Sequence, residues 1–219
     1  MPTPPRELKF AIIATDVVLF TVIGKKLSVL LLRVDRPPHY GDHWGVPGGL
    51  IQPKETAEEA ARRHLHVKAG INDVYLEQLY TFSRVDRDPR GRVVSVAYVA
   101  LVPPGTQVGE GVRWFPIHTL PRLAYDHREV IARAVDRLKA KLAYTSIVSA
   151  LLPVEFTLTE LQQTYEIILE RKLDKRNFRK KIMALSLVKE MLKQKKGMPN
   201  RPARLYRFLS RKPMEIEVL

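Results

Sequence analysis

The fold of the first half of the chain is decided by the stretch Trp44-Gly45-Val46-Pro47-Gly48-Gly49 and by the spacing of five residues after it: Glu55, Arg63, Leu65, Gly70 and Ile71. The glycines allow a tight turn between a strand and a helix. Residues 55–68 have the composition of that helix, since they contain neither proline nor glycine, and Gly70 is placed to end it. The sequence therefore predicts a strand, a glycine-rich turn and a helix.

This spacing resembles the Nudix family. In that family the helix carries carboxylates at adjacent and i+4 positions, so that one face holds a divalent metal against a diphosphate. After Arg63 the family pattern has Glu, an apolar residue, any residue and two consecutive Glu, whereas this chain reads His64-Leu65-His66-Val67-Lys68. All three carboxylates are replaced, at His64, Val67 and Lys68. The resemblance therefore implies a Nudix fold that is not an enzyme and holds no metal or cofactor.

The other polar residues of this helix do not restore a metal site. His64 and His66 lie on different faces of a helix and cannot chelate one ion together, so we expect packing or surface roles for them. The helix keeps three acidic residues, Glu55, Glu58 and Glu59. We expect these carboxylates to be solvated or to pair with Arg62 and Arg63.

Strand patterns surround this motif. Residues 10–34 read as two buried strands joined at Gly24-Lys25-Lys26, and further strands are predicted at 74–82, 93–102 and 112–115. A helix is predicted to start at Asp126, where Glu129 suggests a capping box, and to continue to Leu142. That helix is either plain core packing or a connector to a second domain, and its position before a basic region favours the connector.

Composition excludes several classes of protein. The chain has 219 residues, of which 45% are hydrophobic and 27% charged, and it has no cysteine. Disulfides, thiolate nucleophiles and Cys-ligated zinc are thereby excluded. The longest apolar stretch is too short to cross a bilayer core of about 30 Å. Since the N-terminus also has no secretory pattern, we expect a cytoplasmic protein without membrane contact.

The positive charge is concentrated in one segment. The chain has 37 Lys+Arg and 23 Asp+Glu, and residues 171–212 hold 16 of those cations and only two acids, Asp174 and Glu190. The rest of the chain has 21 of each sign and is neutral. Such a segment is either a solvated basic face or the contact surface for a polyanion, and the interleaved apolar residues favour the polyanion.

The basic segment has the element order of a winged helix-turn-helix. Thr157-Leu158-Thr159-Glu160 is a capping box that starts one helix, and Asp174 caps the next, in which Phe178, Ile182 and Leu185 form an apolar stripe. A basic turn over 197–202 and a strand over 204–208 follow. The alternative is a basic helical hairpin that only packs on the first domain.

We expect the second helix and the wing to contact double-stranded DNA. The candidate residues are Lys175, Arg176, Asn177, Arg179, Lys180 and Lys181 on the helix, and Arg201 and Arg204 on the wing. Arg201 and Arg204 are expected to touch the DNA backbone.

A Nudix fold without its carboxylates, followed by a winged helix, resembles the Nudix-related transcriptional regulators, especially the repressors of NAD biosynthesis. The resemblance extends over nearly the whole chain and includes Arg90-Gly91, 123–127, 156–162, 177–181 and 201–206. It implies a homodimer on a palindromic operator, with the Nudix domain binding ADP-ribose or a related nucleotide metabolite that releases the DNA. Some relatives sense sugars instead.

The resemblance also suggests where the ligand binds. Arg63, Lys68 and Arg90 are candidate phosphate contacts, and Lys68 can replace part of the metal charge. Trp44 and Tyr98 are further candidates, although a core position is favoured for both.

The sequence therefore predicts an α+β protein: a Nudix-like α/β/α sandwich over residues 1–143, including the connector helix, and an α+β winged helix-turn-helix over residues 144–219. Its predicted function is that of a ligand-responsive repressor. The alternatives are a Nudix pyrophosphohydrolase of nucleotide sugars with a basic appendage, a sugar-sensing regulator of the same architecture, and an RNA-binding module. Intact carboxylates would favour the hydrolase, and an exposed aromatic platform would favour RNA binding.

Overall fold

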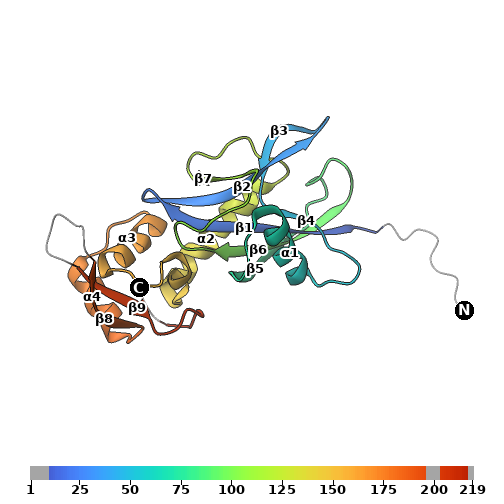
Figure 1. Cartoon of the computed structure of the whole chain (residues 1–219). Helices are drawn as coiled ribbons and strands as arrows, with labels where there is room; N and C mark the ends of the chain where they lie inside the picture. The colour runs from blue at the N-terminus through green and yellow to red at the C-terminus, as the bar shows by residue number, and fades with distance from the viewer. Residues whose placement is uncertain (1–9, 196–202, 217–219) are drawn as a thin grey trace, which may run out of the picture.

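A seven-stranded mixed sheet forms the centre of the N-terminal part in the computed structural model, which describes residues 10–195 and 203–216 (Figure 1). Its strands are β1 (Ile12–Ile23), β2 (Lys26–Arg36), β3 (Tyr40–Gly45), β4 (Gly48–Leu50), β5 (Tyr75–Phe82), β6 (Val93–Leu101) and β7 (Val112–Pro116). The helices of this part are α1 (Ala57–Ala69) and α2 (His127–Tyr144). The strands predicted from hydrophobic runs are all present.

Strand β1 organises the sheet. The order is β3-β2-β1-β6-β5, with β6 parallel to β1 and the other pairings antiparallel. β4 pairs with the first half of β1, and β7 pairs with β2. Central strands buried on both faces need nearly continuous apolar sequence, and residues 14–21 of β1 are all buried.

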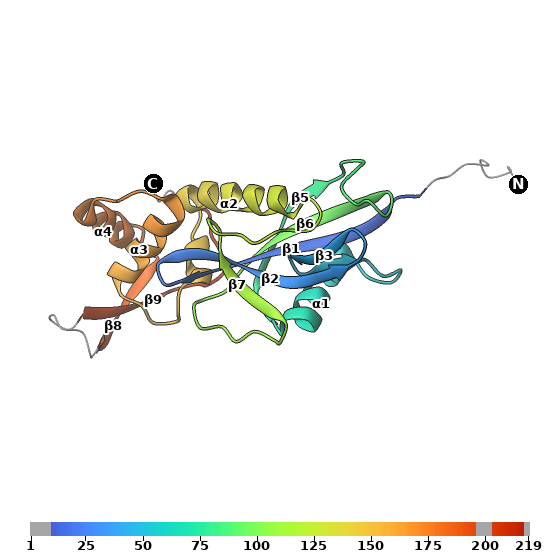
Figure 2. The same cartoon turned by 90° about the horizontal axis from the view of Figure 1, so that it is seen from above.

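The two helices cover opposite faces of the sheet (Figure 2). On one face Leu65 and Ala69 of α1 pack with Val17 and Leu19 of β1. On the other face a larger cluster joins the sheet to α2 and continues into the C-terminal part. The predicted α/β/α sandwich is confirmed.

Local signals fix the ends of α1. Thr56 is the N-cap and forms a reciprocal capping box with Glu59, so the helix begins at Ala57 and not at Glu55 as the composition suggested. Gly70 ends the helix in the left-handed conformation at φ 67°, a conformation that favours glycine. Glu59 therefore serves the cap rather than pairing with an arginine.

Helix α2 starts where predicted, but its predicted cap is wrong. Asp126 makes no side-chain bond to the amides of α2, because its carboxylate is buried and bound to Arg87. Val130, Ile131 and Leu138 of α2 are nearly inaccessible to solvent. Helix α2 therefore packs in the core and also connects the two parts of the chain, since its hydrophobic cluster contains residues of both parts.

The C-terminal part has the predicted winged-helix order. It contains a 3-10 turn η1 (Ile147–Leu151), the helices α3 (Leu158–Leu169) and α4 (Lys175–Ala184), and a hairpin of β8 (Val188–Lys195) and β9 (Ala203–Phe208). The capping box of Thr157 with Glu160 and the cap of Asp174 are confirmed. The sequence patterns gave no prediction for β8, and the predicted basic turn at 197–202 lies outside the described residues.

The two parts share one continuous core. Phe156, before α3, exchanges two backbone hydrogen bonds with Tyr206 of β9, and both side chains are buried. Tyr165 of α3 packs edge-on against Phe178 of α4 and so uses part of the predicted apolar stripe. Within the described ranges, no helix is long and apolar enough to span a membrane.

Candidate functional site

A cavity of about 940 Å³ opens beside the sheet of the N-terminal part. Its walls come from the end of β2, the β3–β4 loop, one face of α1, the loop at 87–91 and the residues just before α2. Binding sites for small molecules are typically cavities of about 300–1,000 Å³ with a few placed polar groups. The cavity is therefore the candidate ligand site.

The glycine-rich stretch forms part of this wall because a side chain does not fit there. A Cβ atom at Gly48 would lie 2.3 Å from the carbonyl oxygen of Thr15 and 2.7 Å from Oδ1 of Asp16. The loop can therefore lie directly on β1, where Gly48 pairs with Asp16. This close approach places Gly48 beside Asp16 in the cavity wall, where the Gly48 carbonyl accepts a hydrogen bond from Lys68.

The three positions where Nudix carboxylates would stand have very different surroundings. Lys68 lines the cavity, is half-buried, and donates a hydrogen bond to the carbonyl of Gly48. His64 is buried against Gly49, and its Nε2 lies 3.2 Å from the carbonyl of Leu50. Val67 is 70% exposed. Within residues 10–195 and 203–216, no group of three or more His, Asp or Glu side chains is arranged to hold a metal ion.

The burial of the two cavity residues of α1 also affects their titration. Burial lowers the pKa of His64, and the positive charges of Arg63 and Lys68 lower it further. Burial likewise lowers the pKa of Lys68, and the charge of Arg36 lowers it further, while the charge of Asp16 opposes the shift. Both shifts make the charged forms of these two side chains less favourable than they are in water.

A buried ion cluster forms the inner wall of the cavity. Arg87 donates to Asp126 at 2.7 and 2.9 Å and to Asp16 at 3.0 Å, and all three side chains are at most 9% exposed. The hydroxyl of Ser95 donates to Asp16 at 2.6 Å. Burial alone would raise the pKa of Asp16, but the contacts with His127 and Arg87 outweigh it and hold that pKa well below its usual range.

His127 connects this cluster to the glycine loop. The backbone amide of Val46 donates to Nδ1 of His127 at 3.2 Å, and Nε2 lies 3.4 Å from Oδ1 of Asp16. Because Nδ1 accepts, a neutral ring carries its proton on Nε2, toward Asp16. The first residue of α2 is thus fixed to both the loop and β1.

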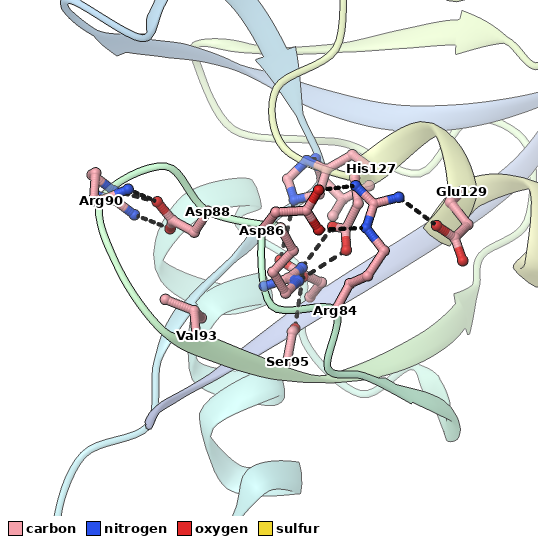
Figure 3. A network of polar contacts seen from close by, with 12 residues as sticks. Arg84, Asp86, Asp88, Arg90, Val93, Ser95, His127 and Glu129 are labelled. Atoms are coloured by element: carbon pink, nitrogen blue, oxygen red, sulfur yellow. Dashed lines mark hydrogen bonds and ion pairs between the residues drawn. The ribbon is translucent and has the colours of Figure 1, made fainter. Parts of the chain in front are cut away.

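Further ion pairs join the β5–β6 loop to the same helix end. Figure 3 shows Arg84 between Asp86 and Glu129, with nitrogen–oxygen distances of 2.8 and 3.9 Å. Arg90 pairs with Asp88 at 2.7 Å and lies over the ring of Tyr125 at 5.6 Å. Tyr125 lines the cavity, and its backbone has a φ of 54°. This left-handed conformation is unusual for a tyrosine, and residues that adopt it are concentrated at functional sites.

The structure places the predicted ligand contacts in different locations. Lys68 and Arg90 line the cavity. Arg63 does not, because its guanidinium pairs with Glu55 at 2.5 Å, a contact that also lowers the pKa of Glu55 to about 2. Arg62 pairs with Glu58 at 2.8 Å.

Trp44 and Tyr98 also lie outside the cavity, in the core position that the sequence favoured. Trp44 is 9% exposed and packs edge-on against Phe115, while Tyr98 belongs to the cluster under α1.

Most predicted DNA-contacting residues form an exposed face on α4, which lies at the outer end of the C-terminal part (Figure 1). The exposed members are Lys175, Arg176, Asn177, Lys180 and Lys181. Arg179 differs, since it is half-buried and donates to the hydroxyl of Thr159 at 3.0 Å. On the wing, Arg204 pairs with Glu190 at 2.5 Å, and Arg201 lies outside the described residues.

Comparisons with known proteins match both parts of the chain. A family model described as the NUDIX domain matches residues 13–134, and a model described as the NrtR DNA-binding winged helix domain matches residues 148–208. The ADPR responsive transcriptional repressor of Acinetobacter baylyi is 35% identical over 206 residues, which are 90% of this chain and 82% of that protein. This chain belongs to the NrtR family of transcriptional regulators.

Two solved structures of NrtR from Shewanella oneidensis are also similar. The structure of that NrtR with a 27mer DNA has a TM-score of 0.79 and 31% identity, covering 90% of this chain and 93% of that chain. The structure of its NUDIX domain with ADP ribose has a TM-score of 0.55 and 33% identity, covering 63% of this chain and 94% of that chain. The NrtR assignment therefore rests on sequence and on architecture.

Sequence reasoning missed several residues of this cavity. Asp16, Arg36 and Arg87 were not candidates, because each stands alone in the sequence without a motif. The segment 123–127 did carry a signal, since it matched the regulator pattern, but that signal did not indicate that Tyr125 and His127 line the cavity.

Proposed function

We propose that the protein is a transcriptional repressor that binds operator DNA and releases it when ADP-ribose occupies the cavity of the Nudix part. The observation that carries this proposal is the physical connection between the cavity and α2. Asp126 and His127, at the start of α2, belong to the ion cluster of the cavity wall. The same helix packs on α3 of the winged helix.

The cavity suits a phosphate-containing effector better than a neutral sugar. Its lining holds five cations, Arg33, Arg36, Lys68, Arg87 and Arg90, against four acidic residues, Asp16, Asp35, Asp88 and Glu110. Charge-assisted hydrogen bonds from such groups to phosphate are stronger than those to hydroxyls. The Shewanella oneidensis NUDIX domain with ADP ribose supports the same effector for this chain.

We also propose that the Nudix part binds this effector without hydrolysing it. Hydrolysis needs a metal-activated water, and Mg²⁺ needs oxygen ligands. His64, Val67 and Lys68 supply none at the positions where the Nudix pattern has carboxylates.

We further propose that a homodimer binds a palindromic site in the cytoplasm, with the exposed face of α4 in the major groove and Arg201 and Arg204 at the backbone. We place the division between the two parts at residues 143–144, which belong to the last turn of α2. A dimer with two recognition helices reads two half-sites about one helical turn, or a multiple of it, apart.

The test is selection of binding sites from random duplex DNA by the full chain, followed by titration of ADP-ribose into the protein–DNA complex. Fluorescence anisotropy of the labelled duplex reports release. The expected result is a palindromic site whose binding weakens as ADP-ribose is added. Binding that is unchanged by ADP-ribose would contradict the proposed effector.

A further inference from the structure

The cations of the cavity differ in whether a carboxylate already neutralises them. Arg33 pairs with Asp42 at 2.7 Å, Arg90 pairs with Asp88, and Arg87 is held between two aspartates. Each of these three guanidiniums already has an acidic partner within the protein. An anionic ligand gains less from such groups, because their charge is already compensated.

Arg36 and Lys68 have no such partner. Among the described residues, neither side chain makes an ion pair, and Lys68 donates its hydrogen bond to the neutral carbonyl of Gly48. The charge of Asp16 does act on Lys68 and raises its pKa, but that carboxylate is already bound by Arg87. The two side chains belong to different walls, the end of β2 and the last turn of α1. Both line the same cavity, and the charge of Arg36 lowers the pKa of Lys68, which is an unfavourable interaction that a bound anion would relieve.

The position of Lys68 is fixed by the glycine loop. Its ammonium lies at the Gly48 carbonyl, and Gly48 itself lies against Asp16. In the Nudix pattern this position carries one of the carboxylates that hold a metal against the diphosphate. A cation fixed here is therefore placed where metal charge would otherwise be.

We propose that Arg36 and Lys68 together form a diphosphate subsite that binds the effector without any divalent metal. This inference rests on the proposed function and specifies how its ligand is recognised. The two side chains supply two unit positive charges, equal to the charge of one Mg²⁺. Arg36 adds a planar fork that matches phosphate oxygens, and Lys68 acts as a point charge.

The carboxylates on the rim do not remove this preference for anions. Asp35 and Glu110 line the cavity but are exposed, as Arg36 is, so solvent screens all three of these charges. Lys68 is half-buried, so its interaction with a bound phosphate is screened less.

The test is calorimetric titration of the full chain with ADP-ribose and, separately, with inorganic pyrophosphate, each in EDTA and in MgCl₂. The variants are Lys68→Met and Arg36→Met. Arg62→Met is the matched control, because it removes the same charge from α1 at a residue that pairs with Glu58 and does not line the cavity. Thermal unfolding of each variant checks that it folds, and Lys68→Arg provides a second variant that keeps the charge.

The expected result is that wild type binds ADP-ribose equally well in EDTA and in MgCl₂. Each cavity variant should lose about 10- to 150-fold in affinity, the value of one charged hydrogen bond, while Arg62→Met and Lys68→Arg keep most of it. Binding of pyrophosphate in EDTA that is lost in Lys68→Met, without binding of ADP-ribose, would support the subsite and refute the proposed effector.

Three results would overturn the subsite. The first is binding of ADP-ribose only with Mg²⁺, and the second is unchanged affinity in both cavity variants; both leave the repressor proposal intact. The third is that neither ADP-ribose nor pyrophosphate binds, which would refute the subsite and the proposed effector together.

Discussion

Replacing Arg87 by methionine should strongly destabilise the protein, because Arg87 is the only cation of the described chain within ion-pair distance of both Asp16 and Asp126. Its side chain is 4% exposed and makes three hydrogen bonds of 2.7 to 3.0 Å to the two carboxylates. Removing one partner of a buried ion pair typically costs about 3–5 kcal/mol, since a charge remains buried without compensation. We expect a loss in this range for Arg87→Met.

The matched control is Arg84→Met in the same loop. Arg84 also links the loop to α2, through Glu129, but its side chain is 61% exposed. Exposed ion pairs contribute about 0–1 kcal/mol. Urea unfolding of the two variants and wild type at neutral pH, followed by circular dichroism, measures the difference.

A second variant separates lost charge balance from lost packing. Adding Asp126→Asn to Arg87→Met removes one of the unpaired carboxylates, so part of the lost free energy of unfolding should return. If Arg87→Met is no less stable than Arg84→Met, the cluster does not hold the start of α2 against the sheet, and the reasoning is refuted.

Three further predictions concern acid stability, DNA binding and catalysis. Because the pKa of Asp16 in the folded protein is lower than the unfolded value of about 3.9, its ion pairs stabilise the fold above that value and are lost as pH falls toward the folded pKa. The difference in unfolding free energy between wild type and Asp16→Asn should therefore shrink between about pH 5 and pH 3, and a difference that grows in acid would contradict the assignment. Lys180→Ala should reduce the slope of log affinity against log salt for operator DNA by about 0.9. The control Lys54→Ala, on an exposed loop before α1, should leave that slope unchanged. If the slopes of Lys180→Ala and wild type are equal, Lys180 does not belong to the interface. The purified protein should release no AMP from ADP-ribose in MgCl₂ above a blank. Turnover near 1 per second, within the usual range for enzymes, would contradict the proposal that the Nudix part does not hydrolyse its ligand.

Local signals made much of the fold predictable. Gly70, Thr157 and Asp174 end or begin helices where the sequence indicated, because a cap depends on a few neighbouring residues. The same reasoning failed at Asp126, whose carboxylate binds Arg87, 39 positions away. A long-range ion pair of this kind leaves no pattern in the neighbouring sequence.

The ligand site was less predictable for the same reason. Arg63 fits the Nudix spacing, yet it pairs with Glu55 and lies outside the cavity. Arg36 has no motif, and only the folding of β2 beside α1 brings it to the cavity with Lys68. Strand β8 was missed because much of its sequence is charged, and its pairing with β9 defines it.

The most direct test of the central claim is reciprocal coupling between the two parts of the molecule. A ligand can release DNA only if it binds the DNA-incompetent state better than the competent one, and the coupling must then act equally in both directions. Calorimetric titration of ADP-ribose into the free protein and into its operator complex measures one direction, and titration of operator DNA with and without ADP-ribose measures the other. We predict that each ligand weakens the other by the same factor, in the range of about 5- to 150-fold. Equal affinity of ADP-ribose for the free protein and for the operator complex would contradict the account.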